Sequence, residues 1–144
     1  MRDETWPDGT DADVLCSFAD GLKQSYQKTI NRFIAIQAMG SDHAREEQRT
    51  LRESVFRHGN PQPEALEGGL NILRPANLRP QLAHISCPCQ LIVGEHDTLF
   101  RHAAAEQTTK LFNNANLSII SGAGHAPFLS HPDVFLDSLQ SFLK

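Results

Sequence analysis

Two short apolar runs in the second half of the chain constrain its fold most strongly. The first is Cys89–Gly94 and the second is Leu117–Ser121. An alanine-rich helical pattern from Arg101 to Phe112 separates them, and a helix from Val134 to Leu143 follows. The order strand, helix, strand, helix is typical of a parallel α/β sheet. A parallel sheet needs other elements to cover both of its faces and neighbouring strands at its edges, so two strands alone make a poor sheet. We therefore expect them to be the end of a larger α/β domain.

The first half of the chain has the pattern of helices. An apolar residue recurs every three or four positions, which predicts a single amphipathic helix from Asp11 to Gly40. The stripe of this helix consists of Leu15, Phe18, Leu22, Tyr26, Ile30, Phe33 and Ile34. A second helix, capped by Ser41, is expected to stop before Pro61, and leucines within residues 66–73 mark a third.

Composition excludes several classes of protein. The 144 residues include 13 Lys+Arg and 17 Asp+Glu, and the net charge of −4 argues against a nucleic-acid binder. No apolar run reaches the roughly 18 residues of a membrane-spanning helix, and the acidic first residues do not form a secretory signal. Three cysteines, with Cys87 and Cys89 in a C-x-C, suit neither a disulfide framework nor a four-ligand zinc site. We therefore expect a cytoplasmic protein without a metal.

The charge is unevenly distributed along the chain. Residues 21–58 carry seven basic and four acidic side chains, which makes a region of net charge +3 in an acidic protein. A region of this kind can steer an acidic partner. The alternative is the solvated surface of a helix.

Polar residues follow both predicted strands. Asp97 comes three residues after Gly94, and His125 lies in a glycine-rich loop after Ser121. The carboxyl ends of neighbouring parallel strands are where open α/β sheets place their sites. An Asp followed by a His in this order matches the last two members of an α/β-hydrolase triad. In that chemistry His125 takes the proton of a nucleophilic serine and Asp97 fixes the His tautomer.

Each of these residues has an alternative role. Asp97 could cap a helix that begins near Phe100. His96 is a rival imidazole, but it directly precedes Asp97, so the two side chains should diverge. The other histidines have no motif around them and are expected at the surface or at helix caps: His43, His58, His84, His102 and His131. No G-x-S-x-G occurs in the chain, so the nucleophile and the oxyanion donor beside it are missing.

Three segments carry a more specific resemblance. They are residues 32–40 (RFIAIQAMG), 67–73 (EGGLNIL) and 124–132 (GHAPFLSHP). Together they resemble the pimeloyl-[acyl-carrier protein] methyl ester esterases of biotin synthesis, which are α/β-hydrolases. The resemblance covers essentially the whole chain. It implies a helical lid or cap at residues 1–80 and the C-terminal βαβα part of the hydrolase core at residues 81–144.

The resemblance also implies roles for individual residues. Asp97 corresponds to the triad acid and His125 to the triad base, with no cofactor. The implied acyl-binding residues, beside His125, are Phe33, Ile34, Ala35, Ile36 and Gln37. The alternative for this segment is that it only packs the lid onto the core.

The region of positive charge gains an implied role as well. The first and the second predicted helix each carry a pair of basic residues four positions apart, so each pair projects from one face of its helix. These are positions at which the family docks acyl carrier protein. These residues are Lys28, Arg32, Arg45 and Arg49. Lys28 replaces an arginine of the family and lacks the bidentate fork of a guanidinium. The alternative is local pairing with Glu46, Glu47 or Glu53.

The family's N-terminal part, with the serine, has no counterpart before Met1. Deliberate truncation, a mis-started reading frame and a separately supplied segment are three explanations that remain open. We expect the parent protein to be a serine carboxylesterase acting on pimeloyl-acyl carrier protein methyl ester, and the isolated chain to be inactive. The alternatives are an α/β-hydrolase for another small ester, and a non-catalytic helical module that binds acyl carrier protein.

Overall fold

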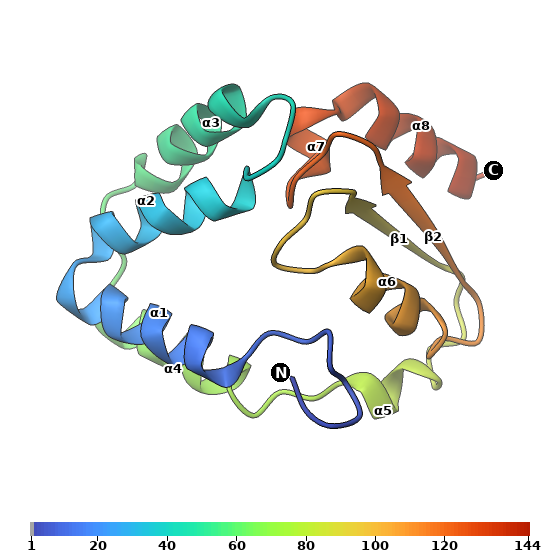
Figure 1. The fold of residues 1–144 in the computed structure, drawn as a ribbon, viewed down its shortest axis with the longest axis horizontal. Coiled ribbons are helices and arrows are strands. Elements are labelled where there is room, and N and C mark those ends of the chain that lie inside the picture. The colour runs from blue at the N-terminus through green and yellow to red at the C-terminus, as the bar shows by residue number, and fades with distance from the viewer. Residues whose placement is uncertain (1) are drawn as a thin grey trace.

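The computed structural model describes residues 2–144 and divides them into a helical first half and a strand-containing second half (Figure 1). The helices of the first half are α1 (Ala12–Gln24), α2 (Tyr26–Gln37), α3 (Ala44–Phe56), α4 (Pro63–Leu73) and α5 (Arg79–Leu82). The second half consists of β1 (Cys89–Gly94), α6 (His102–Thr109), β2 (Ala115–Ile120), α7 (Pro127–Ser130) and α8 (Pro132–Phe142). No helix in the described part of the chain is long and apolar enough to cross a membrane.

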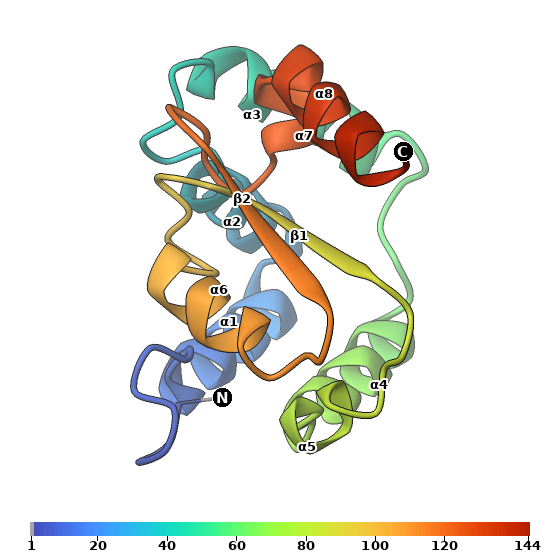
Figure 2. The same cartoon turned by 90° about the vertical axis from the view of Figure 1, so that its right-hand side faces the viewer.

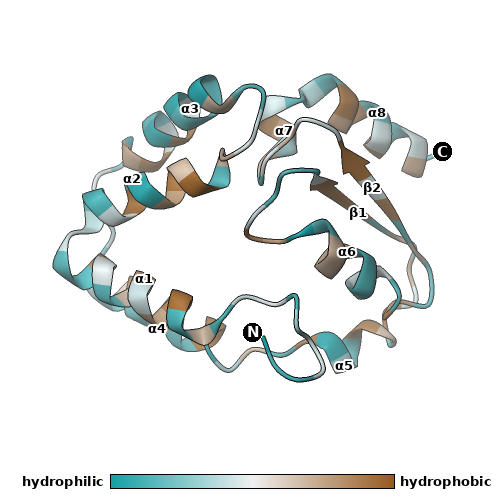
Figure 3. Ribbon diagram, viewed as in Figure 1, coloured by the Kyte–Doolittle hydropathy of each residue, from teal (hydrophilic) through white to brown (hydrophobic). Residues whose placement is uncertain are grey.

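The two strands form the parallel pair that the sequence predicts. Cys89 pairs with Ala115 and Gly94 with Ile120, in continuous register. Helices α6 and α8 lie on opposite sides of this pair (Figure 2). Both strands are apolar along most of their length (Figure 3), and α6 buries Ala104 and Ala105. The predicted strand–helix–strand–helix order is therefore confirmed.

The prediction of one helix from Asp11 to Gly40 is wrong. Ser25, with φ −157° and ψ 88°, is not helical, and it separates α1 from α2. The chain folds back here, so the rings of Phe18 and Phe33 lie 5.1 Å apart, whereas a straight helix would hold these positions about 22 Å apart. Folding back lets one apolar stripe pack against itself, which the periodicity alone cannot distinguish from one long helix.

The core of the helical half lies between α1 and α4. Ala19, Leu22 and Leu70 form the buried cluster. Partly buried side chains surround it: Leu15, Phe18, Tyr26 and Ile30. These are largely the residues of the predicted stripe, so the apolar pattern identifies the core even though the helix is broken.

Other helix boundaries differ from the predictions in smaller ways. Ser41 is not the N-cap of α3, because that position belongs to His43, whose N–H donates to the Ser41 hydroxyl at 3.3 Å. The stop near Pro61 is confirmed, since α3 ends at Phe56 and Gly59 takes a positive φ of 79°. Helices α5 and α7 are not predicted because each spans only four residues, too few to show a helical period.

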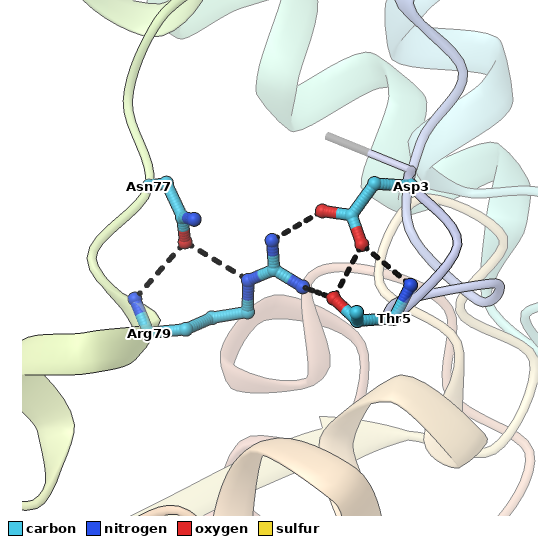
Figure 4. A network of polar contacts seen from close by, with 4 residues as sticks. All are labelled: Asp3, Thr5, Asn77 and Arg79. Atoms are coloured by element: carbon cyan, nitrogen blue, oxygen red, sulfur yellow. Dashed lines mark hydrogen bonds and ion pairs between the residues drawn. The ribbon is translucent and has the colours of Figure 1, made fainter.

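A polar network attaches the N-terminal segment to α5 (Figure 4). Arg79 forms an ion pair with Asp3, and its side chain also donates to Asn77 Oδ1 at 2.9 Å. The same guanidinium lies 5.1 Å from the ring centroid of Trp6. Hydrogen bonds from Arg79 and then Thr5 hold the pKa of Asp3 far below its usual value.

Candidate active site

Asp97 lies in the loop after β1 and uses its two carboxylate oxygens differently. Oδ1 accepts the N–H groups of Leu99 and Phe100, each at 2.8 Å. Oδ2 lies 2.8 Å from Nδ1 of His125. The Asp97 side chain is only 4% exposed. Capping of the following turn and pairing with the histidine are therefore not alternatives, because one carboxylate does both.

His125 lies in the loop after β2 with a half-buried ring. Its side chain is 38% exposed, and its backbone N–H donates to the carbonyl of Gln37 at 2.8 Å. A Cβ on the preceding Gly124 would lie 2.7 Å from that same carbonyl, so only glycine permits this approach. The α2 segment and the His125 loop thus contact each other through backbone atoms.

The Asp97 contact sets the electrostatics of His125. Because Asp97 accepts at Nδ1, the neutral ring carries its proton there and leaves Nε2 free to accept another. The hydrogen bond to Asp97 raises the pKa of His125, and the charges of Asp97 and Glu47 act in the same direction. Partial burial opposes them. This arrangement suits a base that stores a proton during a reaction.

The loop after β1 and the loop after β2 are held together by contacts that the sequence analysis does not predict. Glu95 accepts the Ser121 hydroxyl at 2.6 Å and the Gly122 N–H at 3.1 Å, and these two bonds lower the pKa of Glu95. His96 donates its backbone N–H to Ala123 at 2.9 Å. The position of Glu95 directly after β1, at the same edge of the sheet as Asp97, is a signal from which a role for it could have been predicted.

His96 lies outside the Asp97–His125 pair. Its ring is 47% exposed and its nearest acidic partner is Glu95, 4.0 Å away. The Cβ of His96 instead packs against Gly40, where an added Cβ would lie 2.8 Å from it. The expected divergence of the His96 and Asp97 side chains is the geometry observed.

The predicted acyl-binding segment reaches the site at one end. Gln37 accepts the His125 N–H, so the end of α2 lies beside the candidate base. Ile34 is buried, and Phe33 packs on Phe18 of α1. Ala35 and Ile36 are partly buried. The structure therefore brings the segment next to His125, while part of its apolar surface packs within the helical half of the chain.

The four predicted docking residues are all exposed. They are Lys28 and Arg32 on α2, and Arg45 and Arg49 on α3. None of them forms an ion pair with any residue that the structure describes. The alternative of local pairing with Glu46, Glu47 or Glu53 is therefore not what the structure shows.

Within residues 2–144, no serine hydroxyl is hydrogen-bonded to His125 and no three His, Cys, Asp or Glu side chains could share a metal ion. One groove, of about 520 Å³, lies between β2 and α8, and another, of about 270 Å³, lies between α1 and α4. Neither groove is lined by Asp97 or His125.

Known proteins resemble the chain over almost its whole length. The pimeloyl-[acyl-carrier protein] methyl ester esterase of Xanthomonas oryzae pv. oryzae is 38% identical over 143 residues, which are 99% of this chain and 56% of that protein. The esterase of the same name from Serratia marcescens is 40% identical over 142 residues, 99% of this chain and 55% of that protein. The chain thus spans about half the length of these curated relatives. No family model matches the chain.

Solved structures with low sequence identity share the fold. An esterase from Exiguobacterium antarcticum has a TM-score of 0.83 at 20% identity, over 99% of this chain and 52% of that one. A bromoperoxidase from Bacillus anthracis has a TM-score of 0.83 at 18% identity, over the same shares of the two chains. An α/β-hydrolase from a lagoon-sediment metagenome has a TM-score of 0.52 at 23% identity, over 72% and 47%. The predicted fold class, part of an α/β-hydrolase, is confirmed.

Proposed function

We propose that this chain, a relative of the pimeloyl-[acyl-carrier protein] methyl ester esterases with part of the α/β-hydrolase fold, supplies the acid, the base and the lid of a serine carboxylesterase. The observation that carries this proposal is the 2.8 Å contact between Asp97 Oδ2 and His125 Nδ1. It lies at the carboxyl ends of two parallel strands, where α/β enzymes place catalytic groups.

The proposed reaction is ester hydrolysis through an acyl-enzyme. His125 Nε2 takes the proton of a serine hydroxyl as the serine oxygen attacks the ester carbonyl, and it then gives that proton to the departing methoxide, which leaves as methanol. Water, deprotonated by the same nitrogen, then attacks the acyl carbonyl. The serine oxygen leaves and takes that proton back from His125, and the freed acid ionises to the carboxylate. The serine comes from outside these residues because the chain has no G-x-S-x-G. Asp97 stabilises the imidazolium at each stage.

The proposed division of labour follows the two halves of the chain. Residues 1–80 form the helical lid or cap, and residues 81–144 form the C-terminal part of the hydrolase core. The proposed acyl-binding residues are Phe33, Ile34, Ala35, Ile36 and Gln37, together with His125. Support comes from the bond between Gln37 and His125, because it fixes the end of this segment beside the base. The proposed location of the enzyme is the cytoplasm, and the proposed substrate is pimeloyl-acyl carrier protein methyl ester, as the relatives' names suggest.

The proposed partner surface consists of the four exposed basic residues, Lys28, Arg32, Arg45 and Arg49. Exposed cations without ion pairs attract an acidic carrier protein and speed its docking, and this attraction weakens with salt. We expect the double variant Arg45→Glu/Arg49→Glu to lose most of its binding to acyl carrier protein. The matched control is Arg57→Glu/Arg74→Glu, which changes the same charge at exposed positions elsewhere. Equal losses in both variants would contradict a specific docking surface.

Hydrolysis of p-nitrophenyl butyrate by the purified chain tests the assignment of the nucleophile. We expect no hydrolysis by the chain alone. Activity that disappears in His125→Ala would mean that a serine within these 144 residues serves as nucleophile. Adding the segment of the Serratia relative that this chain does not match should produce activity that requires both Asp97 and His125.

A second test concerns the substrate. With the complemented esterase, we expect the carrier-bound pimeloyl methyl ester to be hydrolysed faster than the free methyl ester. Equal rates would favour an esterase for another small substrate. Binding of acyl carrier protein that survives His125→Ala, with no hydrolysis under any condition, would favour the second candidate, a non-catalytic binding module, which the four unpaired cations also suit.

A further inference from the structure

Glu47 is the one acidic side chain of α3 that is buried. It is 2% exposed, whereas its neighbours Arg45 and Glu46 are exposed. Neither carboxylate oxygen of Glu47 forms a hydrogen bond with any described residue. Helix α3 packs against α7, the short helix that begins two residues after His125 (Figure 1). The lid therefore places an unpartnered carboxyl group against the His125 loop.

The groups that face this carboxyl come from both halves of the chain. Burial raises the pKa of Glu47, whereas the Ser41 hydroxyl, the Ala126 N–H and the imidazoles of His131 and His125 act in the opposite direction and favour the ionised form. None of these groups is a lysine or an arginine. The nearby groups able to carry positive charge are thus imidazoles.

Further titratable groups surround those two imidazoles. The ring of His131 contacts that of His43 at 5.1 Å between centroids, and its Nδ1 lies 3.0 Å from Ser130 Oγ. Asp42 lies beside Gly122, on the same side as His131. His125 has its Nδ1 bonded to Asp97. Of these contacts, only that with Asp97 engages the ring of His125 directly.

An ionised carboxylate is costly to bury unless a positive charge compensates it. Since imidazoles are the compensating groups here, a proton on His125 and the negative charge on Glu47 stabilise each other. Asp97 already binds Nδ1, so Glu47 can act on the ring only through space. A group that acts in this way leaves Nε2 available for the reacting hydroxyl.

We propose that Glu47 is a positioning residue of the site: its ionised carboxylate, carried by the lid helix α3, stabilises the imidazolium of His125 through space. This proposal rests on the proposed function for its catalytic meaning, since the imidazolium forms when the serine is deprotonated. Because Glu47 belongs to α3, the stabilisation exists only while α3 is packed on the His125 loop. The strength of the base is thereby linked to the position of the lid.

The test is an NMR titration of the histidine Cε1–H groups in the purified chain and in matched variants. Glu47→Gln keeps the shape and removes the charge, so the titration midpoint of His125 should move to lower pH. Glu47→Asp keeps the charge and should leave the midpoint closer to that of the original chain. Glu46→Gln removes an exposed charge one position away and should leave it unchanged.

Two results would overturn the proposal. One is an unchanged His125 midpoint in a Glu47→Gln variant whose amide spectrum is native. The other needs no variant: a carboxyl titration of the original chain in which Glu47 is still protonated where His125 titrates. Neither readout requires a serine or an ester, so failure of the esterase assays would leave this test intact, and failure here would leave those assays intact.

Discussion

The helical half of the chain is attached to the sheet half at two places that differ in kind. Near the candidate site, the turn between α2 and α3 meets the His125 loop through backbone hydrogen bonds, Asp42 N–H to Gly122 and His125 N–H to Gln37, at 2.9 and 2.8 Å. We call this contact the buried seam. At the other end, the N-terminal segment and α5 are joined by the exposed network of Arg79 and Asp3 (Figure 4).

The two attachments differ in how tightly they fix the relative position of the two halves of the chain. The buried seam leaves little room, because a Cβ added at Gly124 would lie 2.7 Å from the Gln37 carbonyl oxygen and one at Gly122 would collide with the Asp42 carboxylate. Asp3 and Arg79, by contrast, meet through flexible and partly exposed side chains, so water and salt screen their attraction. The tightly fixed attachment is therefore the buried seam, which lies beside His125, Gln37 and Glu47.

The largest expected effect comes from overfilling the buried seam. In Gly124→Ala the new Cβ would meet the Gln37 carbonyl at 2.7 Å. We expect a loss of about 3 kcal/mol in the free energy of unfolding, at the upper end for overpacked sites. Chemical denaturation measures it. The control is Gly68→Ala in α4, where nothing lies within 4 Å and the chain should gain about 1 kcal/mol. Similar effects in both would mean that the seam is not tightly packed.

A somewhat smaller loss is expected when Asp97 is truncated. Asp97→Ala removes the acceptor of two backbone N–H groups and of the His125 ring. Leaving buried donors unpaired costs about 2 kcal/mol in the free energy of unfolding. Asp97→Asn keeps an acceptor oxygen for the turn and should lose less. If the two variants were equally stable by denaturation, the capping role of Oδ1 would be negligible.

The sequence alone predicts part of the fold and the pairing of the two site residues. The strand order and the Asp97–His125 spacing are local patterns, so period and chain order suffice to predict the parallel pair and to bring the two side chains to one edge. The role of the pair in catalysis stays a prediction. The break at Ser25 escaped prediction because the apolar stripe continues with helical spacing across it.

The buried seam was beyond the reach of sequence patterns for a physical reason. Its contacts join residues 80 or more positions apart through backbone atoms, for which the identity of the side chains gives no signal, as with Gln37 and His125. The burial of Glu47 escaped prediction for a related reason. On a helix with exposed arginines a glutamate looks like their partner, and only the packing of α3 on α7 shows that it is buried.

The pH dependence of stability tests the contribution of the hydrogen bond between Asp97 and His125 in the candidate site. The pKa of His125 is raised in the folded chain, chiefly by its hydrogen bond to Asp97. The resulting stabilisation is therefore complete below the unfolded value of about 6.5, and it is lost as pH rises through the raised folded value. The difference in unfolding free energy between the original chain and Asp97→Asn should narrow from pH 6 towards alkaline pH, as denaturation at several pH values would show. A gap that widens would contradict the raised pKa.

The smallest effect is expected at the exposed network. Asp3→Asn removes the ion pair with Arg79, and screening by water and salt leaves such surface pairs weak. Because the pKa of Asp3 is lowered, chiefly by its bond from Arg79, the contribution is present at neutral pH and disappears as pH falls through the lowered value. We expect a small decrease in melting temperature at low ionic strength, which added salt abolishes, whereas the decrease in Gly124→Ala persists in salt. A salt-insensitive loss in Asp3→Asn as large as that in Gly124→Ala would mean that both attachments are equally rigid, and the accuracy argued for the buried seam would then not be particular to the site.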